Sequence, residues 1–300
     1  MLPIAYSKAV AEARATGIPV VALETSVLSQ GLPQPQNLET ALAMEAAVRE
    51  AGAEPATIAL VDGAIHVGLD RSTLETFATG IGIAKAGARD IGPLLATGAP
   101  GATTVSATMR CAALAGIRIM ATGGIGGVHR GAKDSLDISA DLQELGRTQV
   151  AVICSGAKSI LDLPKTLEVL ESLSVPILGY GIDHFPAFHS RATDMLLDWR
   201  VDTPEQASAA INFHWQTGQG GILVANPVPD DNAIAPDLLK TWVEEALRAA
   251  AENGVSGKAV TPYLLSSIAE ASAGQTLDAN ISLLISNGRL AGKIAAAGQL

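Results

Sequence analysis

Residues 117–142 read IRIMATGGIGGVHRGAKDSLDISADL, and this stretch decides how we read the fold and the site. The apolar start, Ile117–Ala121, predicts a buried strand, and five glycines follow between Gly123 and Gly131. So many glycines let backbone amides approach a ligand closely. A histidine, an arginine, Asp137 and Asp141 come next, so the segment after the strand could bind both an anion and a cation.

Short apolar runs of the same kind recur along the chain and alternate with longer amphipathic ones. The predicted strands are Pro19–Leu23, Thr57–Val61, Ile65–Gly68, Ile117–Ala121, Val150–Cys154, Pro176–Gly179 and Gly221–Ala225. Strands separated by helices indicate an α/β fold, a three-layer α/β/α arrangement with a mainly parallel or mixed central sheet. We find no linker and no internal repeat, so we expect one domain over residues 1–300.

Helices are predicted where apolar residues recur at helical spacing or where capping residues stand. The longest are Asn37–Ala51, Asp237–Ala251 and Leu277–Ala297. Ser72 with Glu75 fits a capping box, and Thr203 before Pro204 fits a helix start.

Composition excludes several classes of protein. A net charge of −10 over 300 residues lacks the basic stripe that nucleic-acid binding requires, so we expect no nucleic-acid partner. No apolar run reaches the roughly 20 residues of a membrane span, so we expect no membrane association. The two cysteines, Cys111 and Cys154, lie far apart, which favours a reducing, cytoplasmic location.

The glycine-rich segments do not match the common nucleotide-binding motifs. In a dinucleotide fingerprint that starts at Gly124 or Gly179, the third glycine position holds His129 or His184. A phosphate-binding P-loop needs Gly-Lys before Ser or Thr, whereas Lys158 is preceded by an alanine. ATP and NAD are therefore poor candidates.

A metal site is suggested only by the two aspartates. The histidines show no zinc-ligand spacing, but Asp137 and Asp141 would share one face if their segment were helical. Magnesium or manganese binds through few carboxylates and several waters. The alternative is that these acidic residues only complement a helix N-terminus.

Two residues that follow predicted strands could carry out chemistry. Lys158 comes just after Val150–Cys154, where partial burial would make its amine a nucleophile; alternatively it lies on the solvated first turn of a helix. Glu24 ends an apolar strand, and burial would suit it to acid or base catalysis; alternatively it only caps a turn.

Two further segments could hold a phosphate. Lys85 lies in what we interpret as a glycine-rich loop, where a solvated lysine is the plain alternative. Residues 103–106 (TTVS) open a predicted helix, and their hydroxyls and free amides could hold an oxygen-rich ligand.

Together these segments resemble the pseudouridine-5'-phosphate glycosidase family, also called the indigoidine synthase A-like family. The matching segments are Ala22–Val27, Lys85, Gly101–Ala107, Ala121–Gly131, Asp137–Leu142, Gly156–Asp162, Pro176–Gly181, Phe185–Phe188, Asn226–Pro227 and Asn280–Ile281. The resemblance implies an α/β/α domain that assembles as a homotrimer. It also implies cleavage of the carbon–carbon bond in a small-molecule substrate, pseudouridine 5'-phosphate, to give uracil and ribose 5-phosphate.

The resemblance also assigns roles to individual residues. It makes Lys158 the nucleophile that forms a Schiff base with the ring-opened ribose and Glu24 the acid that protonates the ring oxygen. It makes Asp141 a proton carrier near the base and Asp137 the ligand of one Mn2+ ion per subunit. The implied substrate contacts are Lys85, Thr104, Val105, Thr122, His129, Ser139, Ala140, Asp141 and Asn280.

Two other functions stay open at this point. One is a Schiff-base lyase or glycosidase that acts on another sugar phosphate. The other is a non-catalytic protein that binds a sugar phosphate, for which Lys158 would be dispensable.

Overall fold

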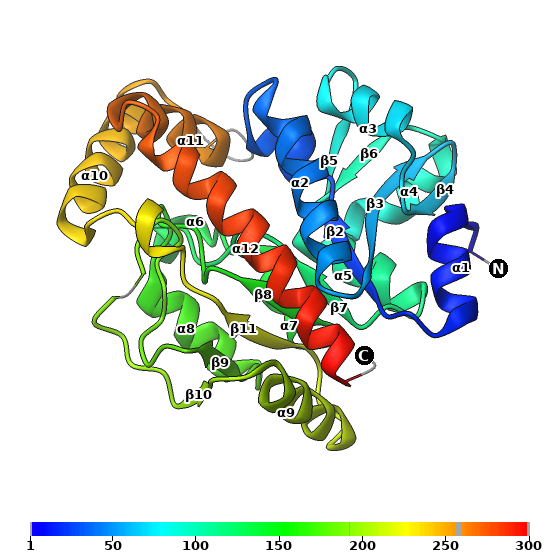
Figure 1. Ribbon diagram of the computed structural model, residues 1–300. Coiled ribbons are helices and arrows are strands. Elements are labelled where there is room, and N and C mark those ends of the chain that lie inside the picture. The colour runs from blue at the N-terminus through cyan, green and yellow to red at the C-terminus, as the bar shows by residue number, and fades with distance from the viewer. Residues whose placement is uncertain (1, 192, 256–259, 299–300) are drawn as a thin grey trace.

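The computed structural model describes residues 2–191, 193–255 and 260–298, and a sheet of 11 strands lies at its centre (Figure 1). The strands along the main path of the sheet, in spatial order, are β1 (Ile4–Tyr6), β4 (Ala64–Val67), β3 (Glu54–Val61), β2 (Val20–Glu24), β7 (Ile119–Ala121), β8 (Ala151–Cys154), β11 (Ile222–Ala225), β9 (Ile177–Tyr180) and β10 (Trp199–Val201). Two further strands, β5 (Ala84–Ala86) and β6 (Gly101–Thr103), extend from β3.

The sheet is mostly parallel. Strand β3 pairs antiparallel with β4 and β6, and the other neighbouring pairs run parallel. Strand β8 is buried at all four positions, as expected for a parallel strand covered on both faces. The predicted α/β architecture is confirmed, and all seven predicted strands are present.

Helices flank this sheet. They are α1 (Lys8–Thr16), α2 (Gln36–Glu50), α3 (Arg71–Ala78), α4 (Ile91–Thr97), α5 (Val105–Leu114), α6 (Ala132–Ser135), α7 (Ala140–Leu145), α8 (Leu163–Ser172), α9 (Pro204–Gln216), α10 (Pro236–Glu252), α11 (Val260–Ala271) and α12 (Gln275–Gly298). Short turns are a π-helical turn η1 (Val27–Gly31) and the 3-10 turns η2 (Ala88–Asp90) and η3 (Asp230–Asn232). Among the described residues, none of the helices combines the length and the apolar character that a membrane crossing requires.

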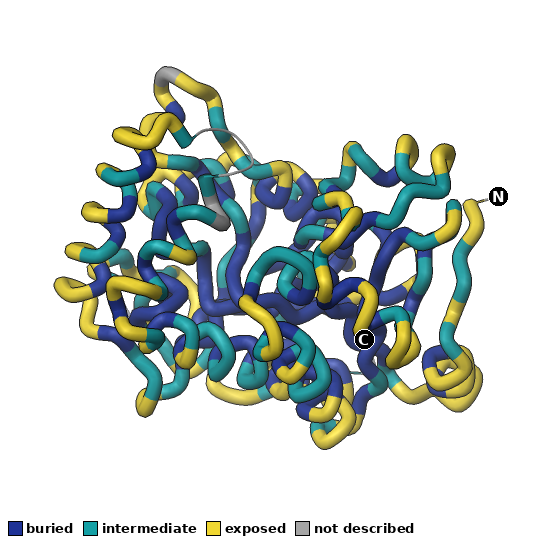
Figure 2. Tube along the Cα trace, turned by 90° about the horizontal axis from the view of Figure 1, so that it is seen from above, coloured by how far each residue is buried: buried dark blue, intermediate teal, exposed yellow. Residues whose placement is uncertain are grey.

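Helix α12 crosses the sheet diagonally beside α2, and it packs on β2, β7 and β8 (Figure 1). The two helices approach closely because their contact is built from small residues. A Cβ atom at Gly292 would lie 2.7 Å from the Cβ of Ala51 and 2.9 Å from the carbonyl oxygen of Val48, so only glycine fits there. Buried segments fill the interior, and exposed ones gather at the outer turns (Figure 2).

Two local predictions were wrong. The cap of α3 is Asp70 and not Ser72: the Asp70 carboxylate accepts a hydrogen bond from the Thr73 N–H at 2.7 Å, and a carboxylate at this position satisfies a free amide well. Lys85 lies in strand β5, paired with Ala102 of β6, and not in a loop. By contrast, the Thr203 cap of α9 is confirmed.

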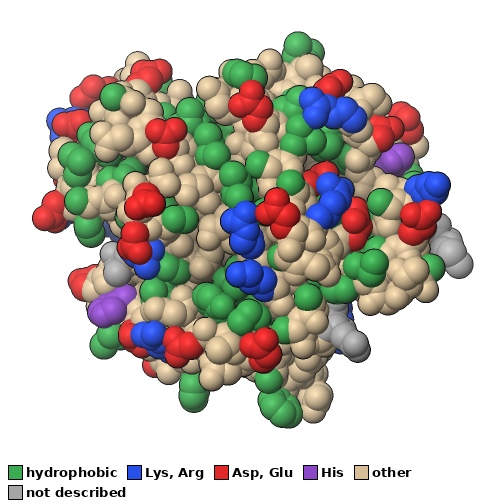
Figure 3. Space-filling view, in the orientation of Figure 1, with side chains coloured by type: hydrophobic (Ala, Val, Ile, Leu, Met, Phe, Trp, Pro, Cys, Tyr) green, Lys and Arg blue, Asp and Glu red, His purple; other side chains and the backbone are tan. Residues whose placement is uncertain are grey.

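The surface in Figure 3 mixes acidic and basic side chains along α2 and α12, as in the ion pair between Arg289 and Glu50 at 3.2 Å. On this face no broad basic patch gathers among the described residues.

Candidate active site

Three neighbouring strands end at the same edge of the sheet and bring the candidate residues together. In register, Leu23 of β2 lies beside Ala121 of β7, which lies beside Ile153 of β8. All three strands run parallel, so the residues at their carboxyl ends lie side by side at this edge. These are Glu24, Thr122 and the loop that carries Lys158. Ligands gather at this edge in open α/β sheets.

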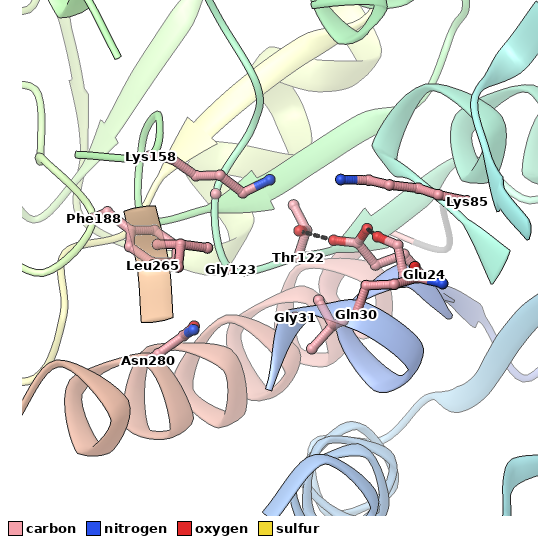
Figure 4. A pocket seen from close by; sticks show the side chains of 13 residues that line it. Glu24, Gln30, Gly31, Lys85, Thr122, Gly123, Lys158, Phe188, Leu265 and Asn280 are labelled. Carbon is pink, nitrogen blue, oxygen red and sulfur yellow. Dashed lines mark hydrogen bonds between the residues drawn. The ribbon is translucent and has the colours of Figure 1, made fainter. Parts of the chain in front are cut away.

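Glu24 ends β2 and is held by two hydroxyl groups. Ser26 donates a hydrogen bond to its Oε2. Thr122 donates one to its Oε1 (Figure 4). Burial raises the pKa of the Glu24 carboxyl, and the positive charge of Lys158 and the two hydroxyl donors oppose that shift. Glu24 is therefore suited to hold a proton at a pH where most carboxylic acids have lost it.

Two lysines face the same space from different elements. In Figure 4 the side chains of Lys158, after β8, and Lys85, from β5, point toward one another above Glu24 and Thr122. The Lys158 backbone N–H donates to the Ile125 carbonyl at 3.2 Å, which ties its loop to the glycine-rich segment. The partly buried Lys158 follows a fully buried strand, so the prediction that it lies just past such a strand is confirmed.

Asp141 lies in α7 and is 6% exposed. Its Oδ1 accepts the Ser106 N–H and its Oδ2 accepts the Gly126 N–H, each at 2.9 Å. A Cβ atom at Gly126 would lie only 2.9 Å from that Oδ2, so glycine is needed for this approach. The Asp141 carboxylate thus joins the first turn of α5, the glycine-rich loop and α7.

Asp137 and Asp141 do not share a helix face, contrary to the expectation from their spacing. Asp137 precedes α7, and its carbonyl oxygen accepts the His129 N–H at 3.0 Å. The Asp137 side chain is 45% exposed, and its Oδ2 lies 3.9 Å from the Nδ1 of His129. Burial lowers the pKa of His129, the Asp137 charge raises it, and the charges of Lys158 and Lys85 lower it further.

These donors limit which metal could bind. Within the described ranges, no three histidine, cysteine or carboxylate side chains group as metal ligands. A lone exposed carboxylate at Asp137 fits only an ion that keeps water or substrate oxygens as its other ligands, which is how magnesium and manganese bind. Manganese at Asp137 stays a prediction.

All of the predicted site residues line two adjoining cavities. The larger, of about 660 Å³, is bordered by Glu24, Lys85, Thr104, Val105, His129, Asp137, Ser139, Ala140, Asp141 and Lys158. The smaller, of about 50 Å³, is bordered by Glu24, Lys85, Thr122, Lys158 and Asn280 among others. The cavities share Glu24, Ser26, Lys85 and Lys158, so these residues stand between them.

Some lining residues were not predicted from the sequence. Ser26 lies two residues after Glu24 and its hydroxyl could have been noticed. Gln30, Phe188 and Leu265 line the smaller cavity from η1, a loop and α11 (Figure 4). No spacing pattern connects these three with Glu24, because only the tertiary fold brings them there.

Comparison with known proteins gives consistent matches. A profile of the indigoidine synthase A like protein family matches residues 9–297. "Pseudouridine-5'-phosphate glycosidase 2" of Rhizobium johnstonii is 51% identical over 292 residues, which cover 97% of this chain and 94% of that protein. "Pseudouridine-5'-phosphate glycosidase" of Jannaschia sp. is 52% identical over 297 residues, 99% of this chain and 98% of that protein.

Two solved structures are also similar. The prealnumycin C-glycosynthase AlnA in complex with ribulose 5-phosphate superposes with a TM-score of 0.92 at 43% identity, covering 99% of this chain and 97% of AlnA. An indigoidine synthase A-like protein from Thermotoga maritima superposes with a TM-score of 0.90 at 34% identity, covering 100% of this chain and 97% of its own.

Proposed function

This chain belongs to the indigoidine synthase A-like family, and from that premise we propose that it is a pseudouridine-5'-phosphate glycosidase. It breaks the carbon–carbon bond of pseudouridine 5'-phosphate reversibly and gives uracil and ribose 5-phosphate. The observation that carries this proposal is the meeting of Glu24 and Lys158 between the two cavities. The names of the relatives that are about half identical over nearly the whole chain support the substrate.

We place the phosphate end of the substrate in the larger cavity. This cavity has cationic side chains, including Lys85, and the first turn of α5 begins there after Thr104. A helix N-terminus favours an anion. His129 and Val105 border the same space and would contact the ribose phosphate.

The reaction begins with the two residues between the cavities. The Lys158 amine attacks C1 of the ribose, the bond from C1 to the ring oxygen breaks, and Glu24 gives its proton to that oxygen. The amine must lose a proton before the next step. Its nitrogen lone pair then forms a carbon–nitrogen double bond while the bond from C1 to C5 of uracil breaks.

The electron pair of the broken bond stays on uracil, and C5 takes up a proton, which balances the proton that the amine lost. Water then hydrolyses the imine, which releases ribose 5-phosphate and restores the lysine. This route solves a specific difficulty: the leaving atom is carbon, so protonating a heteroatom at the bond is not available. AlnA, with 43% identity, binds ribulose 5-phosphate, an open-chain pentose phosphate, which supports a ring-opened sugar in this site.

The supporting residues are proposed on the same basis. Asn280 and Thr122 would contact the base or the ribose, and Ser139 and Ala140 would contact substrate beside Asp141. A manganese ion at Asp137, when bound, would supply positive charge for the substrate phosphate. The proton-carrying role of Asp141, the homotrimer, the single domain and the cytoplasmic location stay predictions.

The test runs the reaction in the synthetic direction. The protein is incubated with uracil, ribose 5-phosphate and Mn2+, and chromatography is used to look for pseudouridine 5'-phosphate. We expect product with the wild type and none with Lys158→Ala. The matched control is Lys165→Ala, because Lys165 is exposed and pairs with Asp162 at 2.6 Å outside the site.

Folded protein that binds ribose 5-phosphate but yields no product would favour the sugar-phosphate-binding alternative. Product from another carbon acceptor, but none from uracil, would favour a related enzyme with a different substrate.

A further inference from the structure

A third cavity, which we call the annex, continues from the smaller active-site cavity, where we place the base because Asn280 would contact it. It has a volume of about 270 Å³ and shares four lining residues with the smaller active-site cavity, namely Gln30, Gly31, Leu265 and Asn280. Its other lining residues are Leu32, Pro33, His189, Ser266, Ala269, Thr276 and Leu277. The larger active-site cavity contributes none of these residues, so the annex lies on the other side of Glu24 and Lys158.

The annex is larger than a single aromatic ring requires. An engineered cavity of about 150 Å³ in another protein holds one benzene molecule. A pyrimidine of similar size would fill the smaller cavity of about 50 Å³ and enter the annex, whose volume of about 270 Å³ then still leaves room for one further ring.

Charge separates the annex from the phosphate end. Among the residues that the structure describes, no lysine, arginine, aspartate or glutamate lines the annex, whereas Lys85, Arg89 and Asp137 line the larger active-site cavity. The histidine of the annex is neutral at physiological pH, because burial lowers the pKa of His189 to about 3. An uncharged, largely apolar group is therefore the occupant with the smallest desolvation cost on entering the annex.

One polar atom at the entrance lacks a partner. The Nε2 of Gln30 donates to the Ile83 carbonyl at 3.4 Å, so its Oε1 points another way, and that oxygen is buried without a hydrogen-bond partner in the described part of the protein. A buried acceptor left unpaired costs about 1–3 kcal/mol. A turn of the Gln30 side chain would bring this oxygen to the wall that the two cavities share, where an N–H group of a ligand would satisfy it.

We propose that the base subsite extends into the annex, so that the enzyme accepts a neutral pyrimidine that carries an additional apolar ring. This inference rests on the proposed function. In the synthetic direction, C5 of the pyrimidine loses its proton and bonds to C1 of ribose 5-phosphate, and the C1 hydroxyl leaves as water. The bonds formed and broken are the same as in the reaction of uracil.

The experiment compares three acceptors with ribose 5-phosphate and Mn2+: uracil, 1-benzyluracil and 3-benzyluracil. We expect a C-riboside phosphate from uracil and from at least one benzyluracil, with rates that differ by about ten-fold or less. Product from uracil alone overturns this inference and leaves the proposed function standing. No product from any acceptor overturns both.

Filling the annex tests where the benzyl group lies. Ala269→Phe places a ring of the same size there, and Ser266→Phe does so from an exposed position that tolerates substitution. In either variant the ratio of benzyluracil to uracil rates falls by about ten-fold or more. The control, Glu270→Phe, adds a ring to an exposed position of α11 outside the annex and keeps the wild-type ratio. An unchanged ratio in folded Ala269→Phe and Ser266→Phe overturns the inference.

Discussion

Two carboxylates of the site, Glu24 and Asp141, are held in opposite ways. Glu24 accepts hydrogen bonds from the hydroxyls of Ser26 and Thr122, whereas Asp141 accepts them from two backbone N–H groups. A hydroxyl can donate or accept, so the partners of Glu24 can adjust when it gains a proton. A backbone N–H can only donate, so the partners of Asp141 need an acceptor at both of its oxygens.

This difference in hydrogen-bond partners indicates that the two carboxylates have different roles. Glu24 lies at the end of a strand beside Lys158 and exchanges a proton during the reaction. Asp141 fixes the first turn of α5 against the glycine-rich loop through Gly126 and so shapes the wall of the larger cavity. We therefore expect changes at Glu24 to affect chemistry and changes at Asp141 to affect stability first.

The largest expected effect follows from Glu24→Gln. Glutamine keeps the shape and both hydroxyl partners but cannot give up a proton to the ring oxygen, so kcat should fall by about 10²–10⁴-fold. Steady-state cleavage of pseudouridine 5'-phosphate measures this loss. Activity within a few-fold of wild type would show that Glu24 is not the acid.

The same variant should be no less stable than the wild type. Burial raises the Glu24 pKa above its ordinary value of 4.5, so ionisation costs the folded state free energy. That cost is absent below pH 4.5 and complete above the folded-state pKa. Above that pKa, the melting temperature of Glu24→Gln should therefore equal or exceed that of the wild type. A lower melting temperature would contradict the raised pKa of Glu24.

The pH dependence of the wild type should show the raised pKa directly. The protonated form of Glu24 opens the ring when pseudouridine 5'-phosphate is cleaved. The kcat for cleavage should therefore fall by about ten-fold per pH unit once the pH exceeds that pKa, which gives the pH profile a falling limb. Asp141→Asn removes a negative charge that contributes to the raised pKa of Glu24, so the limb should persist and move only toward lower pH. Loss of the limb in Asp141→Asn would assign the titrating proton to Asp141 instead.

Asp141→Asn should act mainly on stability. The asparagine amide nitrogen cannot accept a hydrogen bond, so the N–H of Ser106 or of Gly126 loses its partner. Leaving one such buried donor unpaired costs about 1–3 kcal/mol, which a urea titration of folded protein can resolve. Unfolding free energies equal to those of the wild type would show that this carboxylate does not hold the loop and α5 together.

The smallest effect is expected for Thr122→Val. The hydroxyl of Thr122 lowers the pKa of Glu24, so its removal raises that pKa further. The falling limb of the kcat profile should move to higher pH by about one unit or less, since one hydrogen bond is worth about 0.5–1.5 kcal/mol. A move to lower pH would contradict the hydrogen-bond assignment at Glu24.

The sequence predicted the residues at the strand ends better than the tertiary contacts that surround them. Apolar runs such as Val150–Cys154 identify buried parallel strands, and their order along the chain points to the residues that follow them, Glu24 and Lys158. Strand β5 was missed because it has only three residues, of which one is buried, and is held by pairing with β6. The backbone bonds of Asp141 and the approach of Leu265 to the site depend on tertiary packing, which spacing in one sequence does not encode.

The central claim is that Lys158 captures the sugar, and borohydride trapping tests it most directly. The protein is incubated with ribose 5-phosphate, reduced with borohydride and digested, and mass spectrometry locates the modified lysine. The account predicts the adduct on Lys158, with none in Lys158→Ala. An adduct on Lys85, which also faces the cavity, or one that persists in Lys158→Ala, would contradict it.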